Sequence, residues 1–435
     1  MDGSQVLHFK TKFPTCYSID IYGRFEVIQK CHVFRIVTID QIGLSNTANV
    51  DQTGGNEGVS AISQDGSGNL AEVTQSEDPN GIPGFQIPTN MATINQLGGN
   101  ARARIEQSNP DQPNSPTNTA SIDQNSNGTQ QVPPDGIPSG FSLNGRIIQD
   151  GSGNDSSIVQ SGNPNQPPSD GAGSGVTARN DQIGQDNTST VLQNVFDQDA
   201  NPFTDANVYQ DGVGNASNVQ QRGSAALVDV FQMGEGNFSD VSQGPNSEMT
   251  ASVTQNGDNN SSEITQRARS VTATVEQTGT GDSSTIDQLG QSRFSTATVT
   301  QSGTGNTSDV EQTNTSSMAS VTQSGTSGMS TINQSDGEGA EATLTQSGTG
   351  NLSTIMQQGD FQTAMVDQSG NMNESMITQS DANQMASVTQ ASDDNWSSIT
   401  QSGDGNTATV SQMVTSGNMS NITQTGTGNT ATVSQ

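Results

Sequence analysis

One short ending, a Val or Ile, any residue and then Gln, recurs along most of this 435-residue chain. From Gln301 to Gln435 its glutamines fall 11 residues apart, apart from two spacings of 12. Self-similarity at a fixed period is the signature of an architecture in which each repeat packs only on its neighbours. This register constrains the fold more strongly than any other feature of the sequence.

Each unit also alternates internally. In residues 429–435, Asn, Ala, Val and Gln share one parity, while Thr, Thr and Ser fill the other. A period of two is typical of a β-strand with one buried face. The preceding Thr-Gly-Thr-Gly, residues 425–428, contains glycines that supply the positive φ values of a tight reversal. Seven strand residues and four turn residues account for the spacing of 11.

From Gln210 to Gln368 a Gln-x-Gly turn follows every second glutamine of the repeat, as at Gln301, Gln323 and Gln346, so the full repeat of strand, turn, strand and turn spans about 22 residues. One repeat cannot bury its inward face alone, whereas stacked copies form a narrow continuous core. The sequence therefore predicts an all-β fold, a β-solenoid of roughly 32 strands in two parallel, in-register sheets. Stacked Gln and Asn amides at ~4.8 Å would satisfy one another as ladders.

Two sets of residues represent this prediction. The inward ladder consists of Gln401, Asn406, Ala408, Val410, Gln412, Gln424, Asn429, Ala431, Val433 and Gln435. The turn glycines are Gly303, Gly305, Gly403, Gly405, Gly426 and Gly428. Thr, Ser, Asp and Glu of the opposite parity are expected to face water.

The regularity of the repeat divides the chain into three parts. Residues 1–36 form an atypical segment, interpreted as a cap or a wrongly assigned start; residues 37–209 hold repeats with Pro- and Gly-rich insertions; and residues 210–435 form the regular solenoid. Longer links, expected to be surface loops, follow Gln75, Gln107, Gln124, Gln160 and Gln193. If the Gly turns share one edge, most of these links lie on the other, but residues 124–149 break the alternation unless a degenerate strand lies there.

Composition and charge exclude several classes of partner. The chain is only 28% hydrophobic, has a net charge of −31, and contains no Lys or Arg after Arg293. Such a surface repels phosphate backbones and anionic lipid, so no nucleic-acid partner is expected. No apolar run approaches the ~18 residues of a membrane helix, so no membrane insertion is expected either. Residues 1–36 lack the apolar segment and cleavage site of a secretory signal.

Residues for catalysis or metal binding are scarce. Residues 37–435 contain no His, Cys or Lys, so we predict no enzymatic activity, no catalytic residue and no cofactor. Cys16 and Cys31, with His8 and His32, lack the paired spacing of a zinc site, which leaves free thiols or one disulfide. Residues 150–155 resemble a calcium loop without its downstream Glu. We therefore predict no metal site, and assign the acidic residues to solvation rather than cation binding.

The motif Gln-x-Gly-x-x-Asn-x-Ala-x-x-x-Gln stands at residues 41–52, 64–75, 401–412 and 424–435. It resembles the curlin repeat, and the resemblance extends over about residues 37–435. This resemblance implies a curli-like major fibre subunit, a functional amyloid of a secreted cell-surface fimbrium that supports biofilm matrix, cell adhesion and aggregation. The implied partners are further copies of the chain, as a homopolymer through end-to-end strand stacking, together with a nucleator subunit and a secretion machinery.

The last unit, which closes on Gln435, is expected to offer a strand edge to the next molecule. The alternative function is that of a monomeric surface-binding solenoid, an adhesin stalk or an ice-binding protein. Thr-x-Thr pairs at residues 272–274, 296–298, 407–409 and 430–432 would form its binding face. Along the sequence these pairs are too intermittent for a flat, continuous lattice.

Overall fold

The computed structural model describes ten segments of the chain. They are residues 5–8, 25–29, 36–53, 58–77, 90–109, 116–126, 142–162, 175–195, 203–290 and 292–435. These residues form 34 β-strands and fall into two units, Met1–Val230 and Phe231–Gln435. No helix among them has the length and hydrophobicity needed to cross a membrane.

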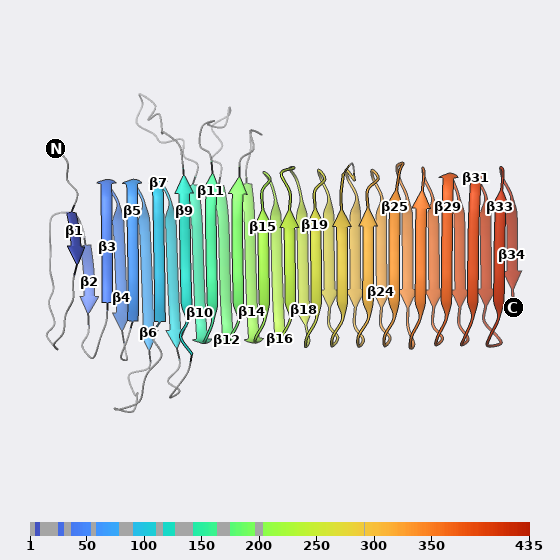
Figure 1. Ribbon diagram of the computed structural model, residues 1–435, viewed down its shortest axis with the longest axis horizontal. Coiled ribbons are helices and arrows are strands. Elements are labelled where there is room, and N and C mark those ends of the chain that lie inside the picture. Colours follow the sequence, from blue (N-terminus) through green and yellow to red (C-terminus); the bar gives the residue numbers. More distant parts are fainter. Residues whose placement is uncertain are drawn as a thin grey trace, which may run out of the picture. The chain divides into compact units, whose positions relative to one another are not determined.

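Consecutive strands belong alternately to two sheets, and the strand directions alternate accordingly in the second unit (Figure 1). The odd-numbered strands of sheet A in this unit are β17 (Phe238–Gln243), β19 (Ser261–Gln266), β21 (Ser283–Gln288), β23 (Thr307–Gln312), β25 (Met329–Ser335), β27 (Leu352–Gln358), β29 (Glu374–Ala382), β31 (Trp396–Asp404) and β33 (Met419–Thr425). The even-numbered strands of sheet B are β18 (Thr250–Asn256), β20 (Thr272–Gln277), β22 (Thr296–Gln301), β24 (Met318–Gln323), β26 (Glu341–Gln346), β28 (Thr363–Gln368), β30 (Met385–Gln390), β32 (Thr407–Gln412) and β34 (Thr430–Ser434).

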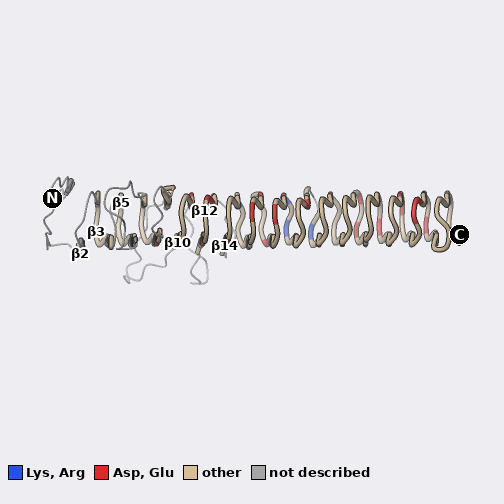
Figure 2. Tube along the Cα trace, turned by 90° about the horizontal axis from the view of Figure 1, so that it is seen from below, with Lys and Arg blue, Asp and Glu red and all other residues tan. Residues whose placement is uncertain are grey.

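Within the second unit, each strand from β19 to β32 pairs in parallel with the strands two before and two after it, without a shift in register. Gln301 of β22, for example, lies opposite Gln277 of β20 and Gln323 of β24. Two strands and their turns therefore make one rung, and the chain passes back and forth between the two layers (Figure 2). The prediction of an all-β solenoid with two parallel, in-register sheets is confirmed.

The first unit has the same alternation. Its sheet A contains β1 (Gln5–His8), β3 (Ile36–Leu44), β5 (Gly58–Ser67), β7 (Asn90–Gly99), β9 (Thr119–Ser126), β11 (Asp155–Gly162), β13 (Thr188–Val195) and β15 (Ala216–Gln221). Its sheet B contains β2 (Phe25–Gln29), β4 (Thr47–Thr53), β6 (Leu70–Glu77), β8 (Arg102–Asn109), β10 (Ser142–Ser152), β12 (Gly175–Gln185) and β14 (Phe203–Val213), while β16 (Leu227–Glu235) spans the boundary between the units in sequence. In residues 1–36, β1 pairs antiparallel with β3 and β2 pairs parallel with β4.

The Gly turns of the first unit do not share one edge. The turn after Gln64 leaves β5 of sheet A, whereas the turn after Gln182 leaves β12 of sheet B. Strand pairing explains why the turns change edge. β9 pairs with β7 and β11 in sheet A, and β10 pairs with β8 and β12 in sheet B. The strands therefore keep alternating between the two sheets across residues 124–149. Link length can vary because links take no part in the ladder. The proline-bearing stretch at residues 163–168 lies outside the described residues.

The core of the second unit is narrow, and its two walls differ. Sheet A strands mostly direct Ser, Ile and Gln inward, as in Ser284, Ile286 and Gln288. Sheet B strands mostly direct Ala, Val and Gln inward, as in β22. Burying one Ile or Val contributes about 1.5–3 kcal/mol, whereas ordering each residue's backbone costs ~1–2 kcal/mol. A rung is therefore stable only when its neighbours supply backbone and amide hydrogen bonds.

Candidate functional site

The surface that one rung presents to the next contains a continuous ladder of glutamine amides in each sheet. In sheet B of the second unit, each Nε2 from Gln232 to Gln412 donates to the Oε1 of the glutamine one rung further on, at 2.7–2.9 Å. In sheet A the corresponding bonds from Gln243 to Gln424 measure 2.8–3.0 Å. Every bond in both ladders runs in the same direction along the chain, so the rung surface has a polarity.

The second hydrogen of these amides ties the two sheets together. Gln323 of sheet B donates to the carbonyl of Thr307, which begins β23 of sheet A, at 3.2 Å. Gln334 of sheet A donates to the carbonyl of Met318, which begins β24 of sheet B, at 3.0 Å. Buried amides are costly unless paired, and both hydrogens and the oxygen of each ladder glutamine from Gln255 to Gln412 are satisfied. The buried Oε1 atoms of Gln362 and Gln384, which lie at turns and not in the ladders, have no hydrogen-bond partner.

The residues of the predicted inward ladder lie on β31 to β34 and their turns. The side chains of Gln401, Asn406, Ala408, Val410 and Gln412 are fully buried, and Gln424 is 6% exposed. Those of the final rung are less covered because β34 pairs only with β32: Ala431 and Val433 are half-buried, and Asn429 and Gln435 are exposed.

Asparagines at the turns form a further column beside the glutamines. Asn406 donates through Nδ2 to the carbonyls of Ser402 and Gly426, at 3.0 and 2.9 Å. Its Oδ1 accepts from the backbone N–H of Asn429 at 3.0 Å. Asn406 therefore closes its own turn and also bonds it to the next rung.

The predicted turn glycines serve two purposes, of which the sequence interpretation named one. Positive φ values of 65° to 102° are found at Gly305, Gly403, Gly405, Gly426 and Gly428. Gly303 is not in that region; a Cβ there would lie 1.7 Å from the carbonyl oxygen of Gly325. At Gly303 the requirement is close approach of two backbones, which only glycine permits.

Asp282, which the sequence interpretation did not single out, occupies an asparagine position in a second such column, which precedes the strands of sheet A, whereas Asn406 and Asn429 precede strands of sheet B. Its backbone N–H donates to Asn260 Oδ1 at 3.0 Å, and its Oδ1 accepts from the N–H and Nδ2 of Asn306 at 2.8 and 3.1 Å. Its Oδ2 is buried and has no hydrogen-bond partner. Burial raises the pKa of Asp282, and the bonds from Asn306 oppose this shift.

The predicted Thr-x-Thr pairs all belong to sheet B. Residues 272–274 of β20 lie beside residues 296–298 of β22, and residues 407–409 of β32 lie beside residues 430–432 of β34. Their apparent intermittency arises because strands of the other sheet come between them in sequence. Each group spans only two strands, and the first outward positions of β24, β26 and β30 between the groups are Met318, Glu341 and Met385.

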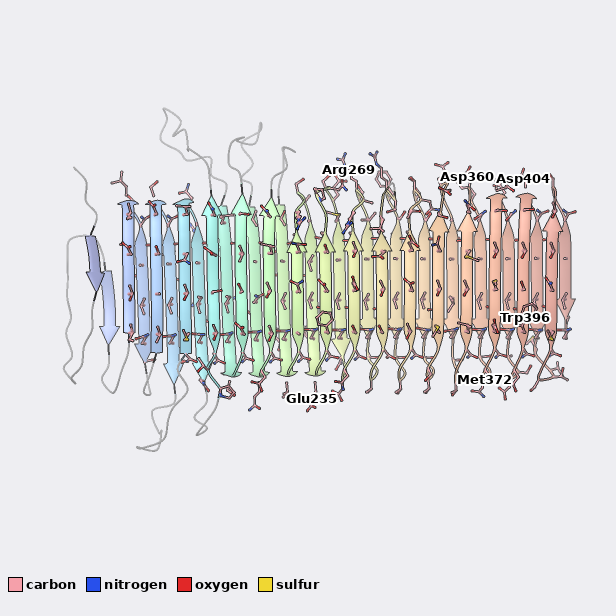
Figure 3. The ribbon with its side chains drawn as sticks, in the orientation of Figure 1. Glu235, Arg269, Asp360, Met372, Trp396 and Asp404 are labelled. Carbon is pink, nitrogen blue, oxygen red and sulfur yellow. The ribbon has the colours of Figure 1, made fainter. Side chains whose placement is uncertain are left out.

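None of the four candidate metal-binding residues has a described side chain. Cys16, Cys31 and His32 lie outside the described residues, and His8 is described only through its backbone. Where side chains are described, no three His, Cys, Asp or Glu residues lie close enough together to hold a metal ion. Titratable groups are instead dispersed over the turns and outer faces, as Glu235, Arg269, Asp360 and Asp404 illustrate (Figure 3).

Short parallel strands, tight turns and buried glutamine ladders define a class, the cross-β solenoid with a two-strand rung. Comparison with protein families narrows this class: the curlin associated repeat matches residues 250–279, 295–325, 348–380, 382–413 and 392–426, all within the second unit. The second unit therefore contains curlin associated repeats, as the motif predicted. The family is structural and typically extracellular. No curated protein matches the chain.

Proposed function

We propose that this chain is a non-enzymatic subunit of extracellular, curli-like amyloid fibres that support biofilm matrix, adhesion and cell aggregation. Copies add to one another by stacking rung on rung. The curlin repeats support the class of fibre, and the interchangeability of the rungs supports self-assembly. Growth from a nucleator subunit and export by a dedicated secretion machinery belong to the same proposal.

The observation that carries the proposal is that identical strands are paired with different neighbours. β24 and β30 both read Met-Ala-Ser-Val-Thr-Gln. β24 lies between β22 and β26, whereas β30 lies between β28 and β32, always in the same register. The surface of a rung consists of backbone groups and glutamine amides, so it does not distinguish one neighbour from another. A rung of a second copy would meet the same complementary surface.

The polarity of the ladders fixes the direction of stacking. Each glutamine donates toward the C-terminal side and accepts from the N-terminal side, as Gln323 does between Gln301 and Gln346. Two copies stacked in the same direction continue this pattern. Two copies stacked in opposite directions would place donor against donor or acceptor against acceptor, and would lose at least one buried amide bond in each sheet.

Seeded growth tests the proposal. The full chain is diluted from denaturant to neutral pH, and thioflavin T fluorescence is followed with and without sonicated fibres of the same chain. We expect a lag phase that the seeds abolish; seeds of an unrelated cross-β fibre serve as the matched control and should leave the lag unchanged. A β-rich chain that stays monomeric when seeded would contradict the proposal and favour the monomeric surface-binding solenoid.

A further inference from the structure

The two outer faces of the second unit differ in chemistry. In each six-residue strand, the first, third and fifth residues point outward. The third residues of sheet B form an uncharged central column of Ser252, Thr274, Thr298, Ser320, Thr343, Met365, Ser387, Thr409 and Thr432. All but Met365 carry a hydroxyl. We call the outward surface of β18 to β34 in sheet B the hydroxyl face.

Carboxylates gather on the opposite face. The outward positions of sheet A carry Asp240, Glu263, Asp287, Asp309, Glu311 and Glu374, and three of these lie in its central column. The hydroxyl face has Glu276, Glu341 and Asp367, all in its two flanking columns. The first outward column is uneven on both faces: sheet A carries Trp396 beside Glu374 and Met419, and the hydroxyl face carries Met318, Glu341 and Met385 among threonines.

The side chains in the central column of the hydroxyl face have the size and register that suit a dry contact between two sheets. Neighbouring strands are in strict register, so Thr274 lies beside Thr298 and Thr298 beside Ser320. Ser and Thr are short, and the stiff β-branched Thr directs a methyl group as well as a hydroxyl outward. The short side chains of the central column, interrupted only by Met365, allow a second identical face to interdigitate along that column, as in a steric zipper.

From this asymmetry we propose that the hydroxyl face is the surface through which two copies of this chain pair side by side. Charge determines the face through which two copies can pair. Each copy carries a net charge of −31, so two copies repel each other least through a face whose centre has no charge. The pairing goes beyond the proposed function, which concerns growth along the stack, because it joins two stacks laterally.

The area of the face is sufficient for such a pair. Nine strands at ~4.8 Å and six residues at ~3.3 Å give a face of roughly 40 by 20 Å. Two copies would then cover about 1,600 Å² in total, which matches the size of a stable protein–protein interface.

Lysine substitutions on the two faces provide the test. The hydroxyl-face variant carries Thr274→Lys, Ser320→Lys and Ser387→Lys, in the central column of β20, β24 and β30, so that no two lysines lie on adjacent rungs. The matched control carries Thr285→Lys, Thr331→Lys and Ser398→Lys, at the equivalent positions of β21, β25 and β31 in sheet A. Both variants change the net charge equally. The measurement is the mass per unit length of filaments grown from the full chain, by scanning transmission electron microscopy.

We expect the hydroxyl-face variant to have half the mass per unit length of the original chain, and the control to keep the full value. Equal values for the original chain and the hydroxyl-face variant, or a halved value for the control, would overturn the pairing. If no filaments form, the proposed function fails separately, and sedimentation decides the pairing: a dimer that only the hydroxyl-face variant loses supports it, and a monomer overturns it. A monomer whose thermal hysteresis or binding to insoluble polysaccharide is lost in that variant would assign the face to that ligand instead.

Discussion

Replacing Asp282 by asparagine should stabilise the protein, although it changes only one atom type and one charge. Asn260 and Asn306, at the equivalent positions of the adjacent rungs, each donate through Nδ2 to a glycine carbonyl of the following rung, at 3.0 and 3.1 Å. The equivalent carbonyl for residue 282 belongs to Gly303, and the buried Oδ2 of Asp282 has no hydrogen to offer it. The introduced asparagine would keep the acceptor for Asn306 and supply the missing donor.

The expected gain follows from removing one buried, unsatisfied oxygen. Such a group costs ~1–3 kcal/mol, so the local free energy of opening should rise by that amount. Hydrogen exchange followed by mass spectrometry, on peptides that cover residues 278–306, should then slow by about 5- to 150-fold near pH 7. Asp367→Asn, which removes the same charge from an exposed position of β28, serves as the control and should change exchange little.

The gain should also depend on pH. Because burial raises the pKa of Asp282 above its unfolded value of ~3.9, the folded state binds more protons between these two values. The contribution of Asp282 to stability is therefore fully present below ~pH 3.9 and is lost as pH rises through the raised folded pKa. D282N should protect most at neutral pH and least in acid. Equal protection at about pH 4 and pH 7, or none at pH 7, would refute the role assigned to the unpaired oxygen.

Three further expectations concern the ladder, the turns and the outer carboxylates. Gln323→Ala should lower the free energy of unfolding by about 3 kcal/mol or more, measured by guanidinium titration, because it leaves buried amide partners unpaired in both directions; an unchanged midpoint would contradict the ladder. Gly303→Ala should destabilise more than Gly305→Ala in the same assay, since a Cβ at Gly305 meets no backbone and costs only ~1 kcal/mol for its positive φ; the reverse order would contradict close rung contact. Burial raises the pKa of the Asp309 carboxyl, and the charge of Asp287 raises it further. Lowering the pH through that pKa should therefore raise the thermal unfolding temperature, and the rise should be larger in the original chain than in the Asp287→Asn variant. An equal dependence of the unfolding temperature on pH in both proteins would contradict this coupling.

The sequence predicted the strands well because the 11-residue repeat and the alternation of inward and outward residues both mark the same strand positions. Each inward Gln is followed by a turn and then by a strand of the same alternation, so a parallel stack is the one arrangement that buries every copy. The segregation of Ser with Ile in one wall and Ala with Val in the other could have been found by comparing only every second strand. The position of Asp282 was also visible, because it fills the Asn position of the turn after Gln277.

Other features depend on spatial pairing that spacing does not specify. The change of edge of the Gly turns in the first unit became clear only from the partners of β9 and β10. The adjacency of the Thr-x-Thr pairs required knowing that alternate strands share a sheet. The reason for Gly303 required the distance to the next rung's backbone, which a turn motif does not contain.

The central claim is that filaments of this chain continue its own rungs from one copy to the next. Cryo-electron microscopy of filaments grown from the full chain tests it most directly. We predict strands perpendicular to the filament axis, rungs repeating every ~4.8 Å across the junction between copies, and all copies pointing in one direction. Filaments whose strands run along the axis, or whose copies meet through turns rather than rungs, would contradict the claim.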